Sequence, residues 1–246
     1  MVLSNNFDIS RRMKKQIFIV FFLSGLIASS QPPPGRTVQF SPAPVHNNFY
    51  KDADLAVVKD KYPPFASGTP YFTDEWLNAD GELEHGETFK DVKMRLDLVE
   101  STLQYISPEG RELVASGAIK TVIFKDSTSG NQFKFVNSSF LGAKKERSAW
   151  FLELISGHAC FYKQILKSIN EPKNYIPGGT EISINSSEEY FIYADSVLLP
   201  VKRIKDVPGL LHYKSKEVNA YMNEHKLSGK SEPGFIELIK YYNSLF

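Results

Sequence analysis

The sequence predicts a mainly β fold. We expect an antiparallel meander that forms a sandwich or a partly open barrel, with two short C-terminal α-helices packed on it. From Thr69 to about Pro200, short stretches rich in β-branched and aromatic residues are separated by turn residues. After Ser215 the apolar residues recur every three or four positions, which is the helical period. Short strands joined by local turns favour an antiparallel sheet.

Each expected strand ends at a turn signal. At 92–98, Val92, Met94 and Leu96 alternate with charged residues, the period of a half-buried strand. Ser156-Gly157 is a good hairpin turn between the expected strands 150–155 and 159–165. The other expected strands are 102–106, 119–124, 133–136, 181–184, 190–193 and 196–201, with turns at 108–110, 127–131, 178–179 and 185–187.

Two C-terminal helices follow from the change of period. Ser215 is placed to cap the first helix, and 231–233 begins the second. The apolar face of the first contains Val218, Tyr221, Met222 and His225, and that of the second contains Phe235, Leu238, Ile239, Tyr242, Leu245 and Phe246. A final strand of an outer-membrane barrel is the alternative, but it would turn Lys240 toward lipid, so the helix is preferred.

The N-terminus has the order of a secretion signal. Four basic residues at 11–15 precede the apolar run 17–23, and Ala28-Ser29-Ser30 precedes three prolines. The run is short for a membrane span, which needs roughly 20 residues. We expect cleavage after Ser30. An uncleaved anchor, a twin-arginine signal and a start at Met13 are the alternatives.

The expected organisation is a signal peptide at 1–30, a proline-rich tether at 31–48, a connecting segment of undecided type at 49–66, an antiparallel β-domain at 67–201 and a helical appendage at 202–246. The mature protein is then periplasmic or secreted, with no transmembrane segment after signal cleavage. Cys160 is the only cysteine, so there is no internal disulfide and no lipoprotein cysteine after the apolar run.

The charge balance bears on the class of partner. The first 30 residues carry four basic side chains and Asp8, while the whole chain has a net charge of +1, so the remainder carries −2. A near-neutral mature chain has no sequence-wide basic field, which argues against nucleic acid as a partner.

Several segments resemble an exported, β-rich protein family of the Bacteroidetes. They are the glycine-proline-aromatic opening with its acidic-aromatic pair at 68–76, the basic-apolar-acidic strand at 89–97, and the helical tail at 216–227 and 237–243. The resemblance covers most of the chain from Gly68 onward. It implies a compartment and domain limits, and it implies no activity.

Two polar groups deserve inspection as metal or nucleophile sites. His158 and Cys160 are two apart on an expected strand, hence on one face, but a zinc site normally has three or four protein ligands. We expect a surface histidine and a packed thiol. Glu82, Glu84, His85 and Glu87 resemble a ligand cluster, but they lie in a turn-rich hairpin where solvated side chains are expected.

Asp74, Glu75 and Asp97 are the candidate carboxylates for glycoside hydrolysis, with Arg95 as an expected salt-bridge partner. The sequence does not set their separation. No glycine-rich phosphate loop, G-x-S-x-G elbow or H-E-x-x-H helix is present. The many aromatic residues are expected in the core of the sheet rather than on a carbohydrate platform. We therefore assign no catalytic, cofactor-binding or metal residues.

The leading function from the sequence is a non-enzymatic exported cell-envelope protein with a binding or structural role. Its partner is an unknown envelope protein, glycan or lipid. One alternative is a carrier of an apolar, lipid-like ligand, for which an apolar pocket of several hundred Å³ is expected. The other is an envelope hydrolase that uses carboxylates.

Overall fold

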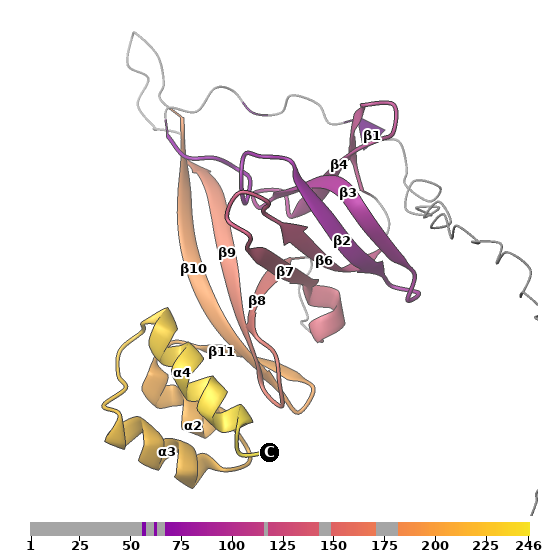
Figure 1. Cartoon of the computed structure of the whole chain (residues 1–246). Coiled ribbons are helices and arrows are strands. Elements are labelled where there is room, and N and C mark those ends of the chain that lie inside the picture. Colours follow the sequence, from indigo (N-terminus) through magenta and orange to yellow (C-terminus); the bar gives the residue numbers. More distant parts are fainter. Residues whose placement is uncertain (1–55, 58–61, 63–66, 116–117, 143–148, 171–181) are drawn as a thin grey trace, which may run out of the picture. The chain divides into compact units, whose positions relative to one another are not determined.

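The structure, a computed structural model, describes residues 56–57, 62, 67–115, 118–142, 149–170 and 182–246. These residues form one antiparallel sheet of eleven strands in the order β1-β5-β4-β3-β2-β6-β7-β8-β9-β10-β11 (Figure 1). β1 and β11 are the two edges, so the sheet is open. The predicted mainly β, antiparallel fold is confirmed, and within the described residues its architecture is a single sheet rather than two packed sheets.

Most strands pair with their neighbours in the sequence. The exceptions are β1, which pairs with β5, and β6, which returns beside β2 after the hairpins from β2 to β5. The strands are β1 (Ala56–Val57), β2 (Leu77–Leu83), β3 (Thr88–Asp97), β4 (Thr102–Ile106), β5 (Glu112–Val114), β6 (Ile119–Lys125), β7 (Gln132–Asn137), β8 (Trp150–Ile155), β9 (Cys160–Asn170), β10 (Ser183–Ala194) and β11 (Val197–Val201). The expected signal at 1–30 and tether at 31–48 lie outside the described residues, as does most of 49–66.

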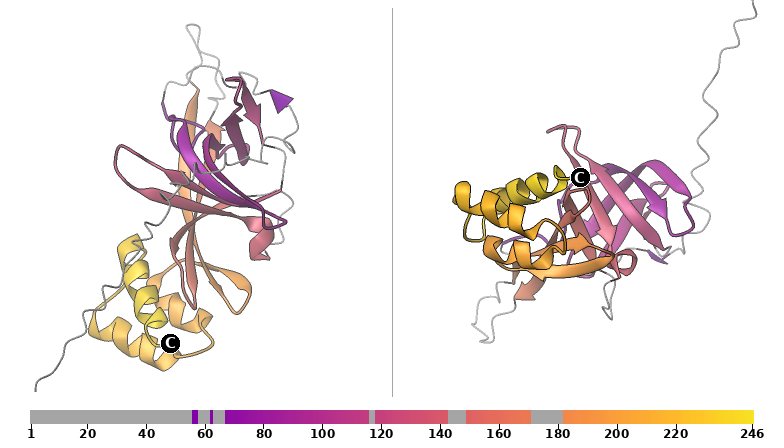
Figure 2. Two further views of the ribbon diagram at one scale, coloured as in Figure 1. Left: turned by 45° about the vertical axis from the view of Figure 1, so that its right-hand side comes forward. Right: turned by 90° about the horizontal axis from the view of Figure 1, so that it is seen from below.

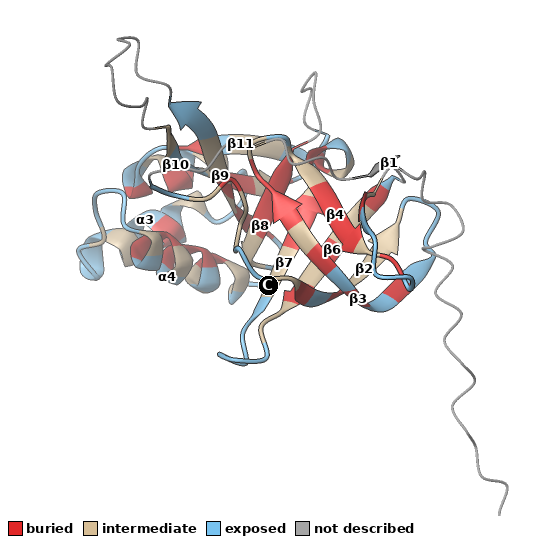
Figure 3. Cartoon of the chain, turned by 90° about the horizontal axis from the view of Figure 1, so that it is seen from above, coloured by how far each residue is buried: buried red, intermediate tan, exposed pale blue. Residues whose placement is uncertain are grey.

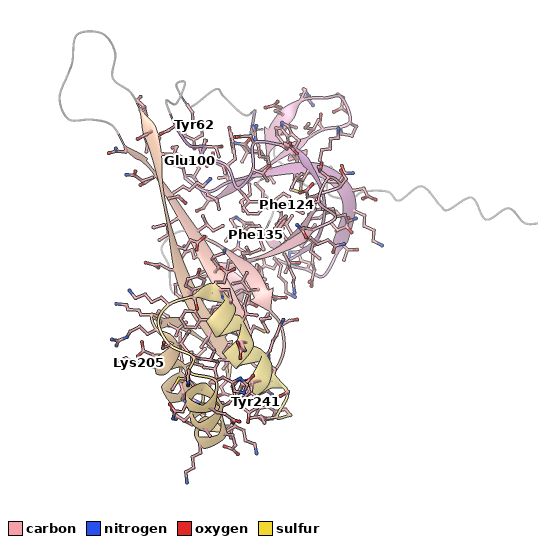
Figure 4. The ribbon with its side chains drawn as sticks, turned by 60° about the vertical axis from the view of Figure 1, so that its left-hand side comes forward. Tyr62, Glu100, Phe124, Phe135, Lys205 and Tyr241 are labelled. Carbon is pink, nitrogen blue, oxygen red and sulfur yellow. The ribbon has the colours of Figure 1, made fainter. Side chains whose placement is uncertain are left out.

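Apolar alternation places the first core on one face of the sheet. Along β3, Val92, Met94 and Leu96 are buried while Lys93 is exposed, and Figure 3 shows buried and exposed positions alternating along the strands. Phe124 and Phe135 meet edge-to-face in this core at 5.9 Å, where Figure 4 labels them. The aromatic residues Phe72 and Phe133 pack against the same core.

A short extended segment, 67–72, connects distant strands of the sheet. Phe72 N–H donates to Leu96 O, and Leu98 N–H donates to Pro70 O, which ties the segment to β3. At its other end Ile184 N–H donates to Ser67 O, which ties the segment to β10. Lys167 Nζ of β9 donates to Thr69 O (2.9 Å) and Tyr71 O (2.5 Å). The sheet is therefore bridged across its opening without closing.

The expected turn at 185–187 does not form. β10 continues through these residues, and Asn185, Ser186 and Ser187 pair with Ser168, Lys167 and Leu166 of β9. All three residues of β10 are exposed. Because this part of the strand is exposed to solvent, it needs no alternation of apolar and polar residues. Its run of polar residues therefore resembles a turn in the sequence. In Figure 1 this part of β9 and β10 extends beyond the other strands.

Three helices, not two, follow the sheet. They are α2 (Val207–Leu210), α3 (Ser215–Glu224) and α4 (Glu232–Asn243), preceded by the 3₁₀ turn η2 (Ile204–Asp206). The four residues of α2 are too few to show a period, which is why the sequence pattern missed it. In α4 the expected residues Phe235, Leu238, Ile239 and Tyr242 are buried. Phe246, in contrast, is 60% exposed.

The helices cover the end of the sheet where β9 begins and β10 ends (Figure 2). Their buried side chains join Phe161 of β9 and Ile192 of β10 in a second core. Asn243 reinforces this contact: its Oδ1 accepts from Ala159 N–H and its Nδ2 donates to Ala159 O. Among the described residues, none of the helices has the length and apolarity to span a bilayer.

Candidate functional site

A row of polar side chains crosses the outer face of the sheet, opposite the first core. Asp80 of β2 is paired with Ile123 of β6, which is paired with Lys134 of β7. Lys134 Nζ lies 3.0 Å from Glu153 Oε1 of β8, and Glu153 is paired with Tyr162 of β9. Five neighbouring strands thus contribute to one continuous face.

A β-bulge adds Lys120 to this face. The register passes from Glu82↔Thr121 to Leu83↔Ile119, so Lys120 has no partner across the ladder. A bulge reverses the side on which a residue points. Here it brings Lys120 Nζ to 2.9 Å from Glu82 Oε1.

A second bulge shapes the adjacent corner of the face. Asp91 of β3 has φ 53°, and its N–H donates to Asp80 Oδ1. Lys125 Nζ lies 2.8 Å from Asp80 and 3.1 Å from Asp91. Partial burial alone would raise the pKa of Asp80, but the hydrogen bonds from Lys125 and Asp91 outweigh it and lower that pKa. Asp80 therefore stays ionised.

Tyr162 forms the other end of the row. Its hydroxyl donates to Glu153 Oε2 at 3.2 Å, and only 3% of the residue is exposed. Burial is the main cause that raises the pKa of Tyr162, and the neighbouring Cys160 and Glu153 add to it. The phenol stays protonated and holds Glu153 in place between two donors, Lys134 and Tyr162.

A groove of about 720 Å³ lies over this face. Charged side chains and a few apolar ones line it. They include Asp80, Glu82, Lys90, Lys120, Lys134, Glu153, Thr121, Ile123, Phe140 and Tyr162. A second hollow of about 450 Å³ also includes Phe140, and its apolar lining includes Leu103, Ile119 and Trp150. Phe140 therefore borders both.

The position of Phe140 is set by the 3₁₀ turn η1 (Ser138–Leu141). Asn137 caps this turn, since its Oδ1 accepts from Ser139 N–H at 3.1 Å. Gly142 ends it with φ 66°, a conformation that favours glycine. Buried Ser138 accepts from Ala149 N–H through its Oγ. These bonds hold the half-buried Phe140 at the boundary of the two hollows.

The structure does not bring His158 and Cys160 together. The expected strand begins only at Cys160, and His158 lies in the turn before it. His158 stacks on Phe246 at 3.8 Å, beside the helices. Cys160 instead packs with the cluster around Phe151 and Tyr162. The same-face expectation was wrong because it extended the strand through the turn.

The Glu82, Glu84, His85 and Glu87 group also separates. Glu82 belongs to the groove and is paired with Lys120, whereas the other three are exposed at the hairpin turn. Within the described part of the chain, no group of three or more His, Cys, Asp or Glu side chains is placed to hold a metal ion.

The three candidate carboxylates have different environments. Asp97 is 1% exposed and accepts from Tyr62 OH and from the N–H groups of Val99 and Glu100. Asp74 is exposed and accepts from Thr69 Oγ1. Glu75 is exposed as well.

Arg95 is not the partner of those carboxylates. Its guanidinium lies over the rings of Tyr71 (3.8 Å) and Trp76 (4.3 Å) and donates to Gln104 Oε1. Its ion pair is with Glu112, at 3.9 Å. Cation–π contacts of this kind are not visible in sequence spacing.

Sequence reasoning missed the groove. Period-two alternation in 119–125 and 132–136 carries part of the signal, because it puts Thr121, Ile123 and Lys134 on the polar face. The pairing of Lys120 with Glu82 and of Lys134 with Glu153 depends on strand register and on a bulge. Comparison of the chain with protein-family models, with curated proteins and with solved structures finds no match.

Proposed function

We propose that this chain is a non-enzymatic exported protein of the cell envelope, and that the groove beside Phe140 binds its partner. The observation that carries the proposal is the groove of about 720 Å³ on the outer face of the sheet, where Phe140 lines both this groove and a second hollow. Binding sites for small ligands have volumes of about 300–1,000 Å³. The side of the sheet beneath the groove is filled by the first core.

The non-enzymatic role is supported by what the candidate groups contact. Asp97 accepts hydrogen bonds from an internal hydroxyl and two backbone amides, and Glu153 accepts hydrogen bonds from Lys134 and Tyr162. His158 and Cys160 face different clusters. A hydrolase needs an acid and a base that converge on one substrate position, and these contacts give no support to such a pair.

A groove-filling variant tests the binding role. Ile123 is half-buried in the groove, so Ile123→Trp places an indole where a partner would lie. Ile169→Trp is the matched control, because Ile169 is 38% exposed on β9 and does not line the groove. We expect molecules captured from native envelopes to be lost with Ile123→Trp and kept with Ile169→Trp. Identical capture by both variants would contradict the proposal.

A carrier of an apolar ligand is the second candidate. The smaller hollow has the expected size, and Leu103, Ile119 and Trp150 give one part of its mixed lining an apolar character. Mass spectrometry of organic extracts from the purified protein tests this function. A stoichiometric lipid would support the carrier, and its absence would leave the polar groove as the binding site.

Export is tested by the N-terminus of the mature protein. We expect protein from a native host to begin at Gln31 and to fractionate with the periplasm or the medium, because Pro32 to Pro34 cannot continue the signal helix. Membrane-bound protein that retains Met1 or Met13 would contradict cleavage.

A further inference from the structure

We infer that the occupant of the groove is a neutral glycan chain, with Phe140 as its stacking platform. This inference rests on the binding function proposed above. It follows from the charge balance of the groove, from the pairing of the strands beneath it on both sides, and from the position of one aromatic residue.

The groove has no net charge to select an ion. Its lining contains three lysines, Lys90, Lys120 and Lys134, and three carboxylates, Asp80, Glu82 and Glu153. Lys120 and Lys134 are paired with Glu82 and Glu153, and Asp80 is paired with Lys125. Nucleic acids and other polyanions are bound through unpaired basic groups, which release counterions. This lining does not provide such a field.

The paired charges still offer many hydrogen bonds. An ammonium group donates up to three and a carboxylate accepts up to about four, so each ion pair retains capacity on both sides. A hydroxyl group both donates and accepts. A chain dense in hydroxyl groups therefore matches alternating donors and acceptors better than a partner of one charge.

The floor of the groove disfavours a peptide strand. Peptides that bind sheets usually add a strand at an exposed edge, where main-chain groups are unpaired. The strands beneath this groove, β2, β6, β7, β8 and β9, each have a neighbour on both sides. Recognition therefore falls mainly to side chains, which suits a glycan.

Phe140 supplies the apolar contact that a sugar ring needs. This residue is half-buried and lines both hollows. The negative face of an aromatic ring attracts the partly positive C–H groups on one face of a pyranose. Because η1 is capped at Asn137 and Gly142, the platform is held before the ligand arrives. Pre-organisation of this kind lowers the entropic cost of binding.

The test is a titration of the purified protein with arrayed neutral, sulfated and uronic-acid oligosaccharides, at low and at high salt. We expect at least one neutral oligosaccharide to bind with little dependence on salt. Phe140→Ala should weaken that binding by about tenfold or more, because it removes the apolar surface on which the sugar ring stacks. Phe140→Tyr should retain it. Tyr213→Ala is the control, because Tyr213 is 58% exposed and does not line the groove.

Three outcomes would overturn the glycan. They are binding confined to sulfated or uronic-acid chains, neutral binding that Phe140→Ala leaves unchanged in a variant with native circular dichroism, and no binding to any oligosaccharide. If the last result occurs while Ile123→Trp still abolishes capture of an envelope molecule, the groove binds another partner and only this inference fails. If Ile123→Trp also has no effect, the proposed binding function fails with it.

Discussion

Gly81 has no room for a side chain. A Cβ at this position of β2 would lie 2.6 Å from Phe89 Cε1 and 2.5 Å from Thr121 O. The ring of Phe89, which is 1% exposed, packs directly on the Gly81 backbone and fills the first core beneath the groove. One missing methyl group thus lets an aromatic residue support the face that carries Asp80 and Glu82.

We predict that Gly81→Ala lowers the free energy of unfolding by about 1–3 kcal/mol, because overpacking forces the ring or the backbone of Thr121 to move. Urea unfolding measures the change. Gly209→Ala is the control: this glycine has nothing within 4 Å of its Cβ position and lies in α2, so alanine there should be neutral or stabilising by up to about 1 kcal/mol. Equal effects of the two substitutions would contradict the argument.

Single residues also mark where sequence reasoning stops. Asp97 and Arg95 were chosen for their charge, and both are important, but their partners are Tyr62, Gln104 and two aromatic rings. Charge type is visible in a sequence. The residue that pairs with a charged side chain depends on packing between segments that can be 35 residues apart, as with Tyr62 and Asp97.

At the scale of elements, α4 is anchored to the sheet by a polar cluster at its N-terminal end. Lys163 Nζ of β9 lies 2.7 Å from Glu232 of α4 and 3.5 Å from Glu188 of β10. Tyr190 OH lies 2.9 Å from Glu188 Oε2 and 3.1 Å from Glu232 Oε2, so its one proton is shared between the two carboxylates. The ring of Tyr190 stacks on Phe161 at 5.6 Å, so the cluster continues into the second core.

The contribution of this cluster to the free energy of unfolding should decline at alkaline pH. Burial alone would lower the pKa of Lys163, but the hydrogen bond and charge of Glu232 outweigh it and raise that pKa. Burial and then Glu188 raise the pKa of Tyr190. The folded chain then holds protons that the unfolded chain loses near pH about 10, so the stabilisation is complete below that pH and declines above it.

We therefore predict that Lys163→Met is less stable than the wild type at pH 8 and that the difference shrinks as pH rises beyond about 10. Urea unfolding across this range measures it. Lys205→Met is the control, since Lys205 is an exposed lysine of η2, labelled in Figure 4. A difference that stays constant through pH 11 would contradict the assignment of the stabilisation to this charge.

Element types were more predictable than their limits. The strand at 92–98 and the helix containing Phe235 and Leu238 were visible because their periods reflect which face is buried. The length of β10 was not, since its solvated half has no period. The groove was not visible either, because it needs the register of five strands and the bulge at Lys120.

At the scale of the whole described fold, the first and second cores share two strands, β8 and β9. Leu154 of β8 packs against both cores, while β9 supplies Phe161 to the second core and Ile165 to the border of the first. The division expected from sequence, a β-domain at 67–201 and a helical appendage at 202–246, follows the change of period. The shared strands instead favour a single cooperative unit, because loss of the helices exposes one end of β9 and β10.

Two spectroscopic probes distinguish these possibilities. The chain has two tryptophans: Trp150 begins β8 and is part of the first core, and Trp76 lies directly before β2. Circular dichroism at the helical wavelength reports mainly α3 and α4. In a cooperative unit the two signals change at the same temperature. Leu238→Ala removes a fully buried side chain of the second core, at a cost of about 2–5 kcal/mol.

We predict that Leu238→Ala lowers both thermal midpoints equally, by about 2–4 °C for each kcal/mol lost. The tryptophan signal then responds to a substitution in a core that contains no tryptophan. Leu238→Met, which nearly conserves the volume, should lower both midpoints much less. If the helical signal alone moves while the tryptophan signal stays at the wild-type temperature, the helices form a separate unit. In that case the boundary predicted from the sequence at 201–202 would also separate two units that unfold independently.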